Sequence, residues 1–423
     1  MTNNSKRKYW LINILSVILV CPVVQVSSGA EVHLTAWIYN NTGWLNFHRQ
    51  AFADYEALNP HIKIDMVPGT ADTLVVALAG GVQVDFIYEA SGRYTAPAAA
   101  GLYADLNHFI GKDETFNMSN YFTNAVEGYI RESALFGMPQ TVSPAILFYN
   151  KNFTAQAGVV IPHNWTWDDL IAIAKKMTRQ SAGSNTEQYG YAYENWTHYN
   201  RWPIYVWLNG GDVFSADLRQ VIVEQPAAVE GLQFMKDLAS VHGIAVLPGH
   251  PSLPDNNYTK QFEVGRAAML PSTRFYNPPA NMEYALAHMP KLTQQATSLI
   301  SNYYSIIATS KHADESWKLI RYLLEISTKP GTIDRFTQAL PSYIPNAREL
   351  IINHPRAANE LLWVEAMDYA RMPYSPPISS WQDINNKYLT PFGRGDISAR
   401  AAAEGIAREA NALLNEYYAA KGK

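Results

Sequence analysis

The stretch that decides the fold runs from Leu135 to Met177, LFGMPQTVSPAILFYNKNFTAQAGVVIPHNWTWDDLIAIAKKM. Its apolar run Ala145–Tyr149 predicts a buried strand. A short helix follows and is expected to end at Ala157-Gly158, because glycine accepts the left-handed conformation that often closes a helix. A second helix is expected to begin at Trp167. The stretch therefore predicts a strand and two helices in close succession.

The paired carboxylates Asp168-Asp169 admit two interpretations. They resemble a catalytic pair, but Thr166 is well placed as an N-cap and Asp169 falls three residues after it, the spacing of a capping box. Negative charge is also favourable in the first turn of a helix. We therefore assign these carboxylates to the start of the helix and not to catalysis.

The N-terminal part of the chain alternates strand and helix signals. Strands are predicted at Glu31–Ile38, Ile62–Val67 and Val84–Tyr88, with helices at 44–58 and 70–79 between them. Helix–strand alternation of this kind predicts an open α/β sheet.

Several short motifs occur in a characteristic order. They are NPHIKI, LAGG, VDFIYE and AAAGLYADL near the N-terminus, Gly210-Gly211, FEVGRAAMLP at 262–271, and Leu340-Pro341. With the opening stretch, they closely resemble bacterial extracellular solute-binding proteins of ABC importers, in the carbohydrate-binding, maltose-binding-protein-like family 1. The matches extend over nearly the whole chain after residue 30.

The resemblance implies a two-lobed α/β fold of the periplasmic-binding-protein type II, with several chain crossings forming a hinge and the ligand cleft between the lobes. The crossings would fall near Val142–Pro144, Ser298–Asn302 and Pro341–Tyr343. Lobe one would comprise 31–142 plus 302–342, and lobe two 143–301 plus 343–423.

Residues 1–30 have the features of a secretory signal peptide. A basic segment, Lys6-Arg7-Lys8, precedes the apolar run Leu11–Val20, and Ser28-Gly29-Ala30 offers small residues for cleavage before Glu31. We expect a periplasmic or extracellular protein. Cys21 is the sole cysteine, and Val20 before it makes lipid anchoring the minor alternative. Mature protein would then carry neither a thiol nor a disulfide.

Composition narrows the function classes. Cleavage after Ala30 removes three of the 33 basic residues and none of the 37 acidic ones, leaving 30 against 37 and a net charge of −7. This charge argues against nucleic acid or an anionic membrane as partner. The sequence contains no nucleophile-elbow, zincin, P-loop or dinucleotide motif, and its 11 histidines show no metal-ligand spacing. We expect no cofactor, no metal and no enzymatic activity.

Candidate ligand-binding residues stand at predicted strand ends and crossings, because open α/β sheets bind ligands beyond the carboxyl ends of their strands. Aromatic rings would stack on the apolar faces of a sugar, while charged and amide groups would hydrogen-bond its hydroxyls. The candidates are Trp37, Tyr39, Asn41, Tyr88, Glu89, Arg93, Ser143, Tyr199, Trp202, Arg274, Phe275, Tyr303, Tyr304, Tyr343 and Trp381.

The resemblance carries ligand contact over to six of these positions: Glu89, Arg93, Trp202, Phe275, Tyr303 and Tyr304. The chain departs from the family at two others. Some maltose-binding relatives have acidic residues where this sequence has Gly92 and Ser143. That difference puts maltodextrin itself in doubt as the ligand.

The sequence thus predicts a monomeric binding component of an ABC sugar importer. It would capture a mono- or oligosaccharide, or a polyol, and deliver it to the permease. Two alternatives remain open. The same fold could bind glycerol phosphate or another non-sugar solute, or the protein could be an exported glycoside-active enzyme, which would require two suitably spaced carboxylates.

Overall fold

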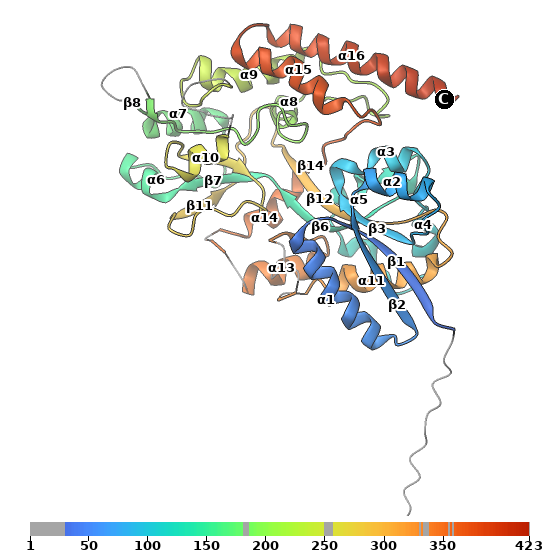
Figure 1. The fold of residues 1–423 in the computed structure, drawn as a ribbon. Helices are drawn as coiled ribbons and strands as arrows, with labels where there is room; N and C mark the ends of the chain where they lie inside the picture. Colours follow the sequence, from blue (N-terminus) through green and yellow to red (C-terminus); the bar gives the residue numbers. More distant parts are fainter. Residues whose placement is uncertain are drawn as a thin grey trace, which may run out of the picture.

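The computed structural model describes residues 30–180, 186–248, 257–329, 331–332, 338–353, 356–357 and 359–422. The predicted signal peptide, with Cys21, lies outside the described residues. Figure 1 shows two α/β lobes, one built on the N-terminal strands and one carrying the C-terminal helices. Among the described residues, no helix combines the length and apolar character needed to cross a membrane.

The elements alternate as the sequence predicts. The strands are β1 Val32–Tyr39, β2 Ile62–Gly69, β3 Phe86–Ala90, β4 Ile130–Arg131, β5 Ala134–Leu135, β6 Met138–Pro144, β7 Ile146–Asn150, β8 Arg179–Gln180, β9 Thr186–Gln188, β10 Met269–Ser272, β11 Tyr284–Ala287, β12 Thr297–Ile306, β13 Leu340–Pro341 and β14 Ala370–Arg371. The helices are α1 Thr42–Leu58, α2 Ala71–Ala79, α3 Thr95–Ala99, α4 Asn107–Ile110, α5 Thr123–Glu127, α6 Lys151–Ala157, α7 Trp167–Met177, α8 Pro203–Leu208, α9 Pro226–Ser240, α10 Tyr258–Glu263, α11 Ala313–Glu325, α13 Ile344–Asn353, α14 Leu362–Glu365, α15 Trp381–Arg394 and α16 Ala399–Ala420.

The larger sheet has the order β13-β6-β12-β3-β1-β2, with β14 paired to β12. Strands β1, β2 and β3 are parallel, whereas β12 runs antiparallel to β3 and β6. The smaller sheet, β10-β7-β11, is antiparallel and belongs to the other lobe. Because β6 leads through Ala145 directly into β7, the chain passes from one sheet to the other without a loop.

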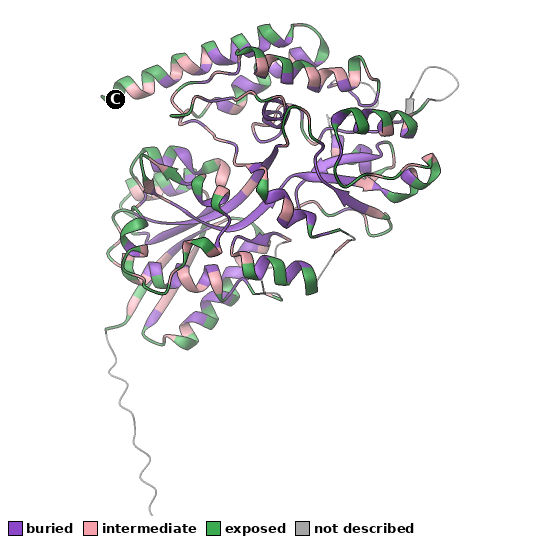
Figure 2. Ribbon diagram, turned by 180° about the vertical axis from the view of Figure 1, so that it is seen from behind, coloured by how far each residue is buried: buried purple, intermediate pink, exposed green. Residues whose placement is uncertain are grey.

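The buried residues form three hydrophobic clusters. One combines residues of 34–138 with 303–339, and a second combines residues of 145–296 with 381–414. The third contains residues from both sheets and from 340–370, so it packs where the lobes meet. Figure 2 shows the buried strands running through the middle of both lobes, with exposed helix faces outside. The predicted lobe boundaries remain a prediction.

The helix caps predicted within the Leu135–Met177 stretch are confirmed. Thr166 and Asp169 form a capping box at the start of α7, with the Asp169 carboxylate 2.8 Å from the backbone nitrogen of Thr166. Gly158 closes α6 in the left-handed conformation, with φ 61°. The third strand lies at Phe86–Ala90, two residues later than predicted. Just before it, the Asp85 carboxylate accepts a hydrogen bond from the backbone nitrogen of Thr35 at 2.8 Å.

A buried histidine organises the core of lobe one. His48 on α1 is fully buried; its Nδ1 lies 2.7 Å from the carbonyl oxygen of Trp44 and its Nε2 lies 2.8 Å from the Tyr304 hydroxyl. A carbonyl only accepts, so Nδ1 donates to it and Nε2 accepts from Tyr304. The ring also contacts Tyr88, with centroids 4.5 Å apart. Burial lowers the pKa of His48 to about 3.

This burial predicts an acid-sensitive fold. Between pH 6.5 and 3 only the unfolded chain protonates His48, so its contribution is complete above pH 6.5 and declines as the pH falls through that window. Acidification from pH 7 to 5 should cost about 2 kcal/mol at this residue. Denaturant unfolding at both pH values should show a smaller loss for His48→Gln, whereas the exposed control His33→Gln should behave as wild type. Equal pH slopes in all three proteins would contradict the assignment.

Candidate functional site

Two charged residues of lobe one, Glu89 and Arg93, lie at and just after the carboxyl end of β3. Glu89 is completely buried, and its carboxylate accepts hydrogen bonds from the backbone nitrogens of Ala71 and Ala90, each at 2.8 Å. Arg93 lies 3.4 Å from Glu89 and its guanidinium stands 5.5 Å from the centre of the Tyr39 ring. Burial raises the pKa of Glu89, opposed by those two backbone donors and by Arg93. Glu89 therefore holds the start of α2 and positions Arg93.

The two lobes touch directly beside this group. Gly92 of lobe one faces the Tyr199 side chain of lobe two so closely that a Cβ at Gly92 would lie 1.9 Å from the Tyr199 hydroxyl oxygen. Tyr199 in turn donates its backbone N–H to Gln382, at 3.2 Å. A Cβ at position 92 would therefore require the Tyr199 ring or the lobes to shift, so Gly92 permits the close approach seen here.

A second contact between the lobes comes from the hairpin β4–β5. Its two turn residues, Glu132 and Ser133, have φ of 48° and 69°, left-handed values that side chains adopt at a cost in free energy. The hairpin presents Arg131, whose guanidinium lies between the rings of Tyr94 and Tyr374, 5.3 and 5.0 Å from their centres.

Charged side chains extend this contact across the lobes. Arg219 of lobe two lies 3.6 Å from Glu132 and 5.2 Å from the centre of the Tyr418 ring. Lys421, just after α16, donates to the carbonyl oxygen of Ala99 on α3. The C-terminal end of α16 therefore lies against lobe one (Figure 1).

These elements enclose a cavity of about 760 Å³, which we call the interlobe pocket. Lobe one contributes α3 and the β4–β5 hairpin, and lobe two contributes the 216–219 loop, Tyr374 and the end of α16. The pocket is lined by Thr95, Ala98, Ala99, Gly101, Ile130, Arg131, Glu132, Ala134, Phe136, Ala216, Asp217, Leu218, Arg219, Tyr374, Pro377, Tyr417, Tyr418 and Lys421. It combines aromatic faces with charged hydrogen-bonding groups of both signs.

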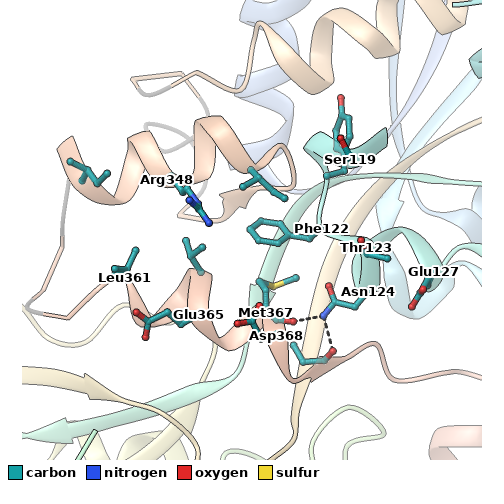
Figure 3. A pocket seen from close by; sticks show the side chains of 15 residues that line it. Ser119, Phe122, Thr123, Asn124, Glu127, Arg348, Leu361, Glu365, Met367 and Asp368 are labelled. Atoms are coloured by element: carbon teal, nitrogen blue, oxygen red, sulfur yellow. Dashed lines mark hydrogen bonds between the residues drawn. The ribbon is translucent and has the colours of Figure 1, made fainter. Parts of the chain in front are cut away.

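A second cavity, of about 800 Å³, lies between α5, α13 and α14 (Figure 3). There the Asn124 amide donates to the carbonyl oxygens of Met367 and Ala370, at 2.6 and 2.8 Å. These bonds fix α5 to the segment after the third crossing. This cavity contains no residue of the 216–219 loop or of the C-terminal helices that face lobe one. We therefore take the interlobe pocket as the candidate ligand site.

The structure brings together three of the predicted site residues at the lobe contact: Tyr39, Arg93 and Tyr199. Tyr39 and Tyr199 are half-buried, and Arg93 is exposed. None of the fifteen predicted residues lines the interlobe pocket itself.

Most other predicted residues have structural partners. Tyr88, Tyr303 and Tyr304 are completely buried in the lobe-one cluster, and Trp202 and Trp381 are buried in the lobe-two cluster. The sequence placed these rings in the cleft because they stand at strand ends and crossings, whereas in this structure they pack within hydrophobic clusters. Trp37 donates its indole N–H to the carbonyl oxygen of Thr70 at 3.0 Å, and Asn41 caps α1.

Two predicted residues, Ser143 and Tyr343, lie at the crossings, and two others, Arg274 and Phe275, follow β10. The Ser143 hydroxyl accepts from the backbone nitrogen of Arg274 at 2.8 Å, and the Arg274 guanidinium, also buried, lies 3.1 Å from Glu360. Phe275 is half-buried against the lobe-one cluster, although it follows a strand of lobe two. Tyr343 is half-buried against Tyr121, with ring centres 5.4 Å apart. These side chains connect chain segments within the hinge region.

Sequence reasoning missed the aromatic residues that line the pocket: Phe136, Tyr374, Tyr417 and Tyr418. Tyr417 and Tyr418 belong to a helix whose pattern indicates ordinary packing on lobe two. Only the position of its last turn against lobe one distinguishes them. The adjacent pair Arg131-Glu132 in a tight turn was the one local signal that could have indicated this site.

Comparisons with known proteins agree with the fold. The model of the bacterial extracellular solute-binding protein family matches residues 46–327. A protein of Brucella abortus named as a binding protein is 21% identical, covering 96% of this chain and 99% of its own. The sugar-binding protein MalE of Xanthomonas citri superposes with a TM-score of 0.75 at 18% identity, covering 93% of this chain and all of that chain. The cyclic alpha-maltosyl-1,6-maltose binding protein of Arthrobacter globiformis gives 0.74 at 19% identity, covering 92% and 100%.

The fold defines a two-lobed binding protein of the periplasmic type II class. Because the family model spans well over half of the sequence, the chain belongs to the bacterial extracellular solute-binding proteins.

The Gly92 contact predicts a variant that resists lobe closure. Gly92→Ala should displace the Tyr199 ring or part the lobes, weakening ligand binding by about tenfold if closure becomes about 1.4 kcal/mol less favourable. Small-angle scattering should show a larger radius of gyration with an unchanged far-ultraviolet circular dichroism spectrum. The double variant Gly92→Ala, Tyr199→Phe should regain part of the affinity, since the oxygen at 1.9 Å is removed and only the ring carbon at 3.0 Å still crowds the added Cβ. An unchanged affinity and radius in Gly92→Ala would show that the contact plays no part in closure.

Proposed function

We propose that this protein is the substrate-binding component of an ABC sugar importer. It captures a mono- or oligosaccharide, or a polyol, between its lobes and delivers it to the transmembrane permease subunits. The observation that carries the proposal is the interlobe pocket, in which both lobes contribute aromatic rings and charged hydrogen-bonding groups. The names of the MalE and cyclic-maltose-binding relatives support a carbohydrate as the ligand class.

The lining suits a sugar chemically. The rings of Phe136, Tyr374 and Tyr418 offer flat apolar faces for the C–H surfaces of a pyranose. Arginine and carboxylate groups can donate to and accept from its hydroxyls. A hydroxyl left without a partner in a closed pocket is costly, so these polar groups would select the sugar accepted.

Capture would follow from the two-lobe architecture. Contacts that the ligand makes with both lobes exist only when the lobes are close, so binding shifts the population toward the closed form. We propose the lobe boundaries given by the sequence, 31–142 plus 302–342 and 143–301 plus 343–423. We further propose export by the 1–30 signal peptide to the periplasm or cell exterior, and action as a monomer.

Isothermal titration calorimetry against a panel of mono- and oligosaccharides and polyols tests the proposal. At least one should bind with one-to-one stoichiometry and produce a smaller radius of gyration in scattering. A failure of every carbohydrate to bind, with a glycerol phosphate or oligopeptide binding instead, would overturn the sugar assignment and retain the fold.

The pocket assignment has its own test. Tyr374→Ala should lower sugar affinity at least about tenfold, because removing an aromatic anchor from a binding site typically costs about 2 kcal/mol. Tyr388→Ala is a matched control, since this half-buried tyrosine of the same lobe lies outside the pocket and bonds Glu409 at 2.9 Å. Equal affinities in the two variants would place the ligand elsewhere in the cleft.

A phosphorylated solute is the second candidate. Arg131, Arg219 and Lys421 all line the pocket, and guanidinium groups bind phosphate well. Two carboxylates oppose an anionic ligand: Glu132 is paired with Arg219, and Asp217 also lines the pocket.

A glycoside-active enzyme has less support. A general acid needs a raised pKa, whereas the hydrogen bond from the Ser215 hydroxyl lowers the pKa of Asp217. Glu89, whose pKa is raised, is buried beneath the start of α2 and lies outside the pocket lining.

A further inference from the structure

Outside the interlobe pocket, two histidines and a carboxylate converge from three separate segments. His163 lies in the loop between α6 and α7, His288 follows β11, and Glu365 ends α14. The candidate ligand atoms of all three lie within 4.8 Å of one another. These residues are 125 and 77 positions apart in sequence, which is why spacing gives no sign of the cluster.

From this geometry we propose a divalent transition-metal site, with Zn²⁺ as the ion that it fits. The Nε2 atom of His288 lies 3.0 Å from a carboxylate oxygen of Glu365, and the Nε2 atom of His163 lies 4.0 Å from the same oxygen. In a tetrahedral zinc site with bonds of about 2.0–2.1 Å, ligand atoms stand about 3.4 Å apart. The observed separations bracket this value, so small side-chain rotations would complete the site.

The ligand chemistry selects the ion class. Two imidazoles and one carboxylate suit zinc and its neighbours in the first transition row, whereas magnesium and calcium prefer sets made of oxygen alone. Three protein ligands leave a fourth position for water or another donor. All three residues line a cavity of about 360 Å³, whose wall also includes Tyr149, Pro162 and Asn359.

His288 has the support expected of a metal ligand. It is buried, and its Nδ1 lies 2.7 Å from the Tyr369 hydroxyl. With a metal on Nε2, the Nδ1 atom would carry the proton and donate it to the Tyr369 oxygen, which fixes both the tautomer and the ring orientation. The rings of His163 and His288 are 5.0 Å apart and inclined at 70°, so both can point an edge toward one ion.

The metal site would connect segments of the chain that do not line the interlobe pocket. His163 and His288 belong to the lobe with the small sheet, while α14 follows the third crossing and also borders the cavity in Figure 3, where Glu365 is labelled. A bound ion would therefore fix the position of α14 against β11. Since none of the three ligands lines the interlobe pocket, the metal would stabilise the fold and leave sugar contacts unchanged.

Titration of tag-free, chelator-treated protein with ZnCl₂ tests the proposal. We expect one equivalent to bind by calorimetry, the melting temperature to rise, and neither Mg²⁺ nor Ca²⁺ to compete. Co²⁺ in place of Zn²⁺ should give the intense visible absorption of a four-coordinate ion.

Variants locate the site. His163→Ala, His288→Ala and Glu365→Gln should each weaken zinc binding at least about a hundredfold, and Tyr369→Phe about tenfold, since the last removes only the group that orients a ligand. His163 is exposed, so its loss should leave the circular dichroism spectrum intact and exclude misfolding as the cause. The control is His33→Ala, an exposed histidine that also lies near two carboxylates, Glu31 and Asp65, at 2.8 and 3.7 Å.

Zinc binding that survives in His163→Ala and His288→Ala, or that disappears in His33→Ala, would overturn the proposal. Absence of any zinc-dependent heat or thermal shift would do the same and leave His288 and Glu365 as a hydrogen-bonded pair.

Discussion

The architecture depends on the two strands that belong to both lobes. Strand β12 pairs with β14 at its beginning, with β6 along its middle and with β3 toward its end. Its partner β6 continues through Ala145 into β7, the central strand of the smaller sheet. Their backbone hydrogen bonds fix where each lobe begins relative to the other. The pocket faces, the hinge contacts and the third hydrophobic cluster all take their positions from this pair of strands.

Buried polar groups make these junctions specific. Ser143 binds the backbone of Arg274, Arg274 pairs with Glu360, and Thr141 on β6 lies 3.4 Å from the Asn302 amide oxygen on β12. A buried donor or acceptor without its partner costs free energy, so these groups favour one arrangement of the crossings. Ser143 and Arg274, which the sequence predicts as ligand contacts, thus also hold chain segments together at these junctions.

The wall of the interlobe pocket includes a turn with unfavourable backbone dihedral angles and several charged side chains. The hairpin turn at Glu132-Ser133 has an unfavourable backbone conformation, yet it brings Arg131 between two tyrosine rings and Glu132 toward Arg219. Strain of this kind persists where surrounding contacts compensate for it, and it is common at binding sites. Here Tyr374 and Arg219 of the opposite lobe supply part of those contacts. Separation of the lobes would remove these two contacts, so this hairpin is directly coupled to closure.

The sequence alone determined the alternation of strands and helices, the helix caps at Thr166 and Gly158, and, through ordered motifs, the family. These features depend on residues close together in the chain, so local hydrogen bonding and periodicity can be recognised from the sequence.

The sequence was less informative about the site. Tyr303 and Tyr304 are successive residues of one strand and point to opposite faces of the sheet. Both are buried, because the sheet carries packed side chains on each side: His48 of α1 meets Tyr304, and Tyr94 and Tyr103 meet Tyr303. Only the tertiary structure decided that Tyr374 and the last turn of α16 face lobe one, and that His163, His288 and Glu365 converge. Such proximity arises between segments far apart in sequence, where neither pattern nor spacing records which side chains will meet.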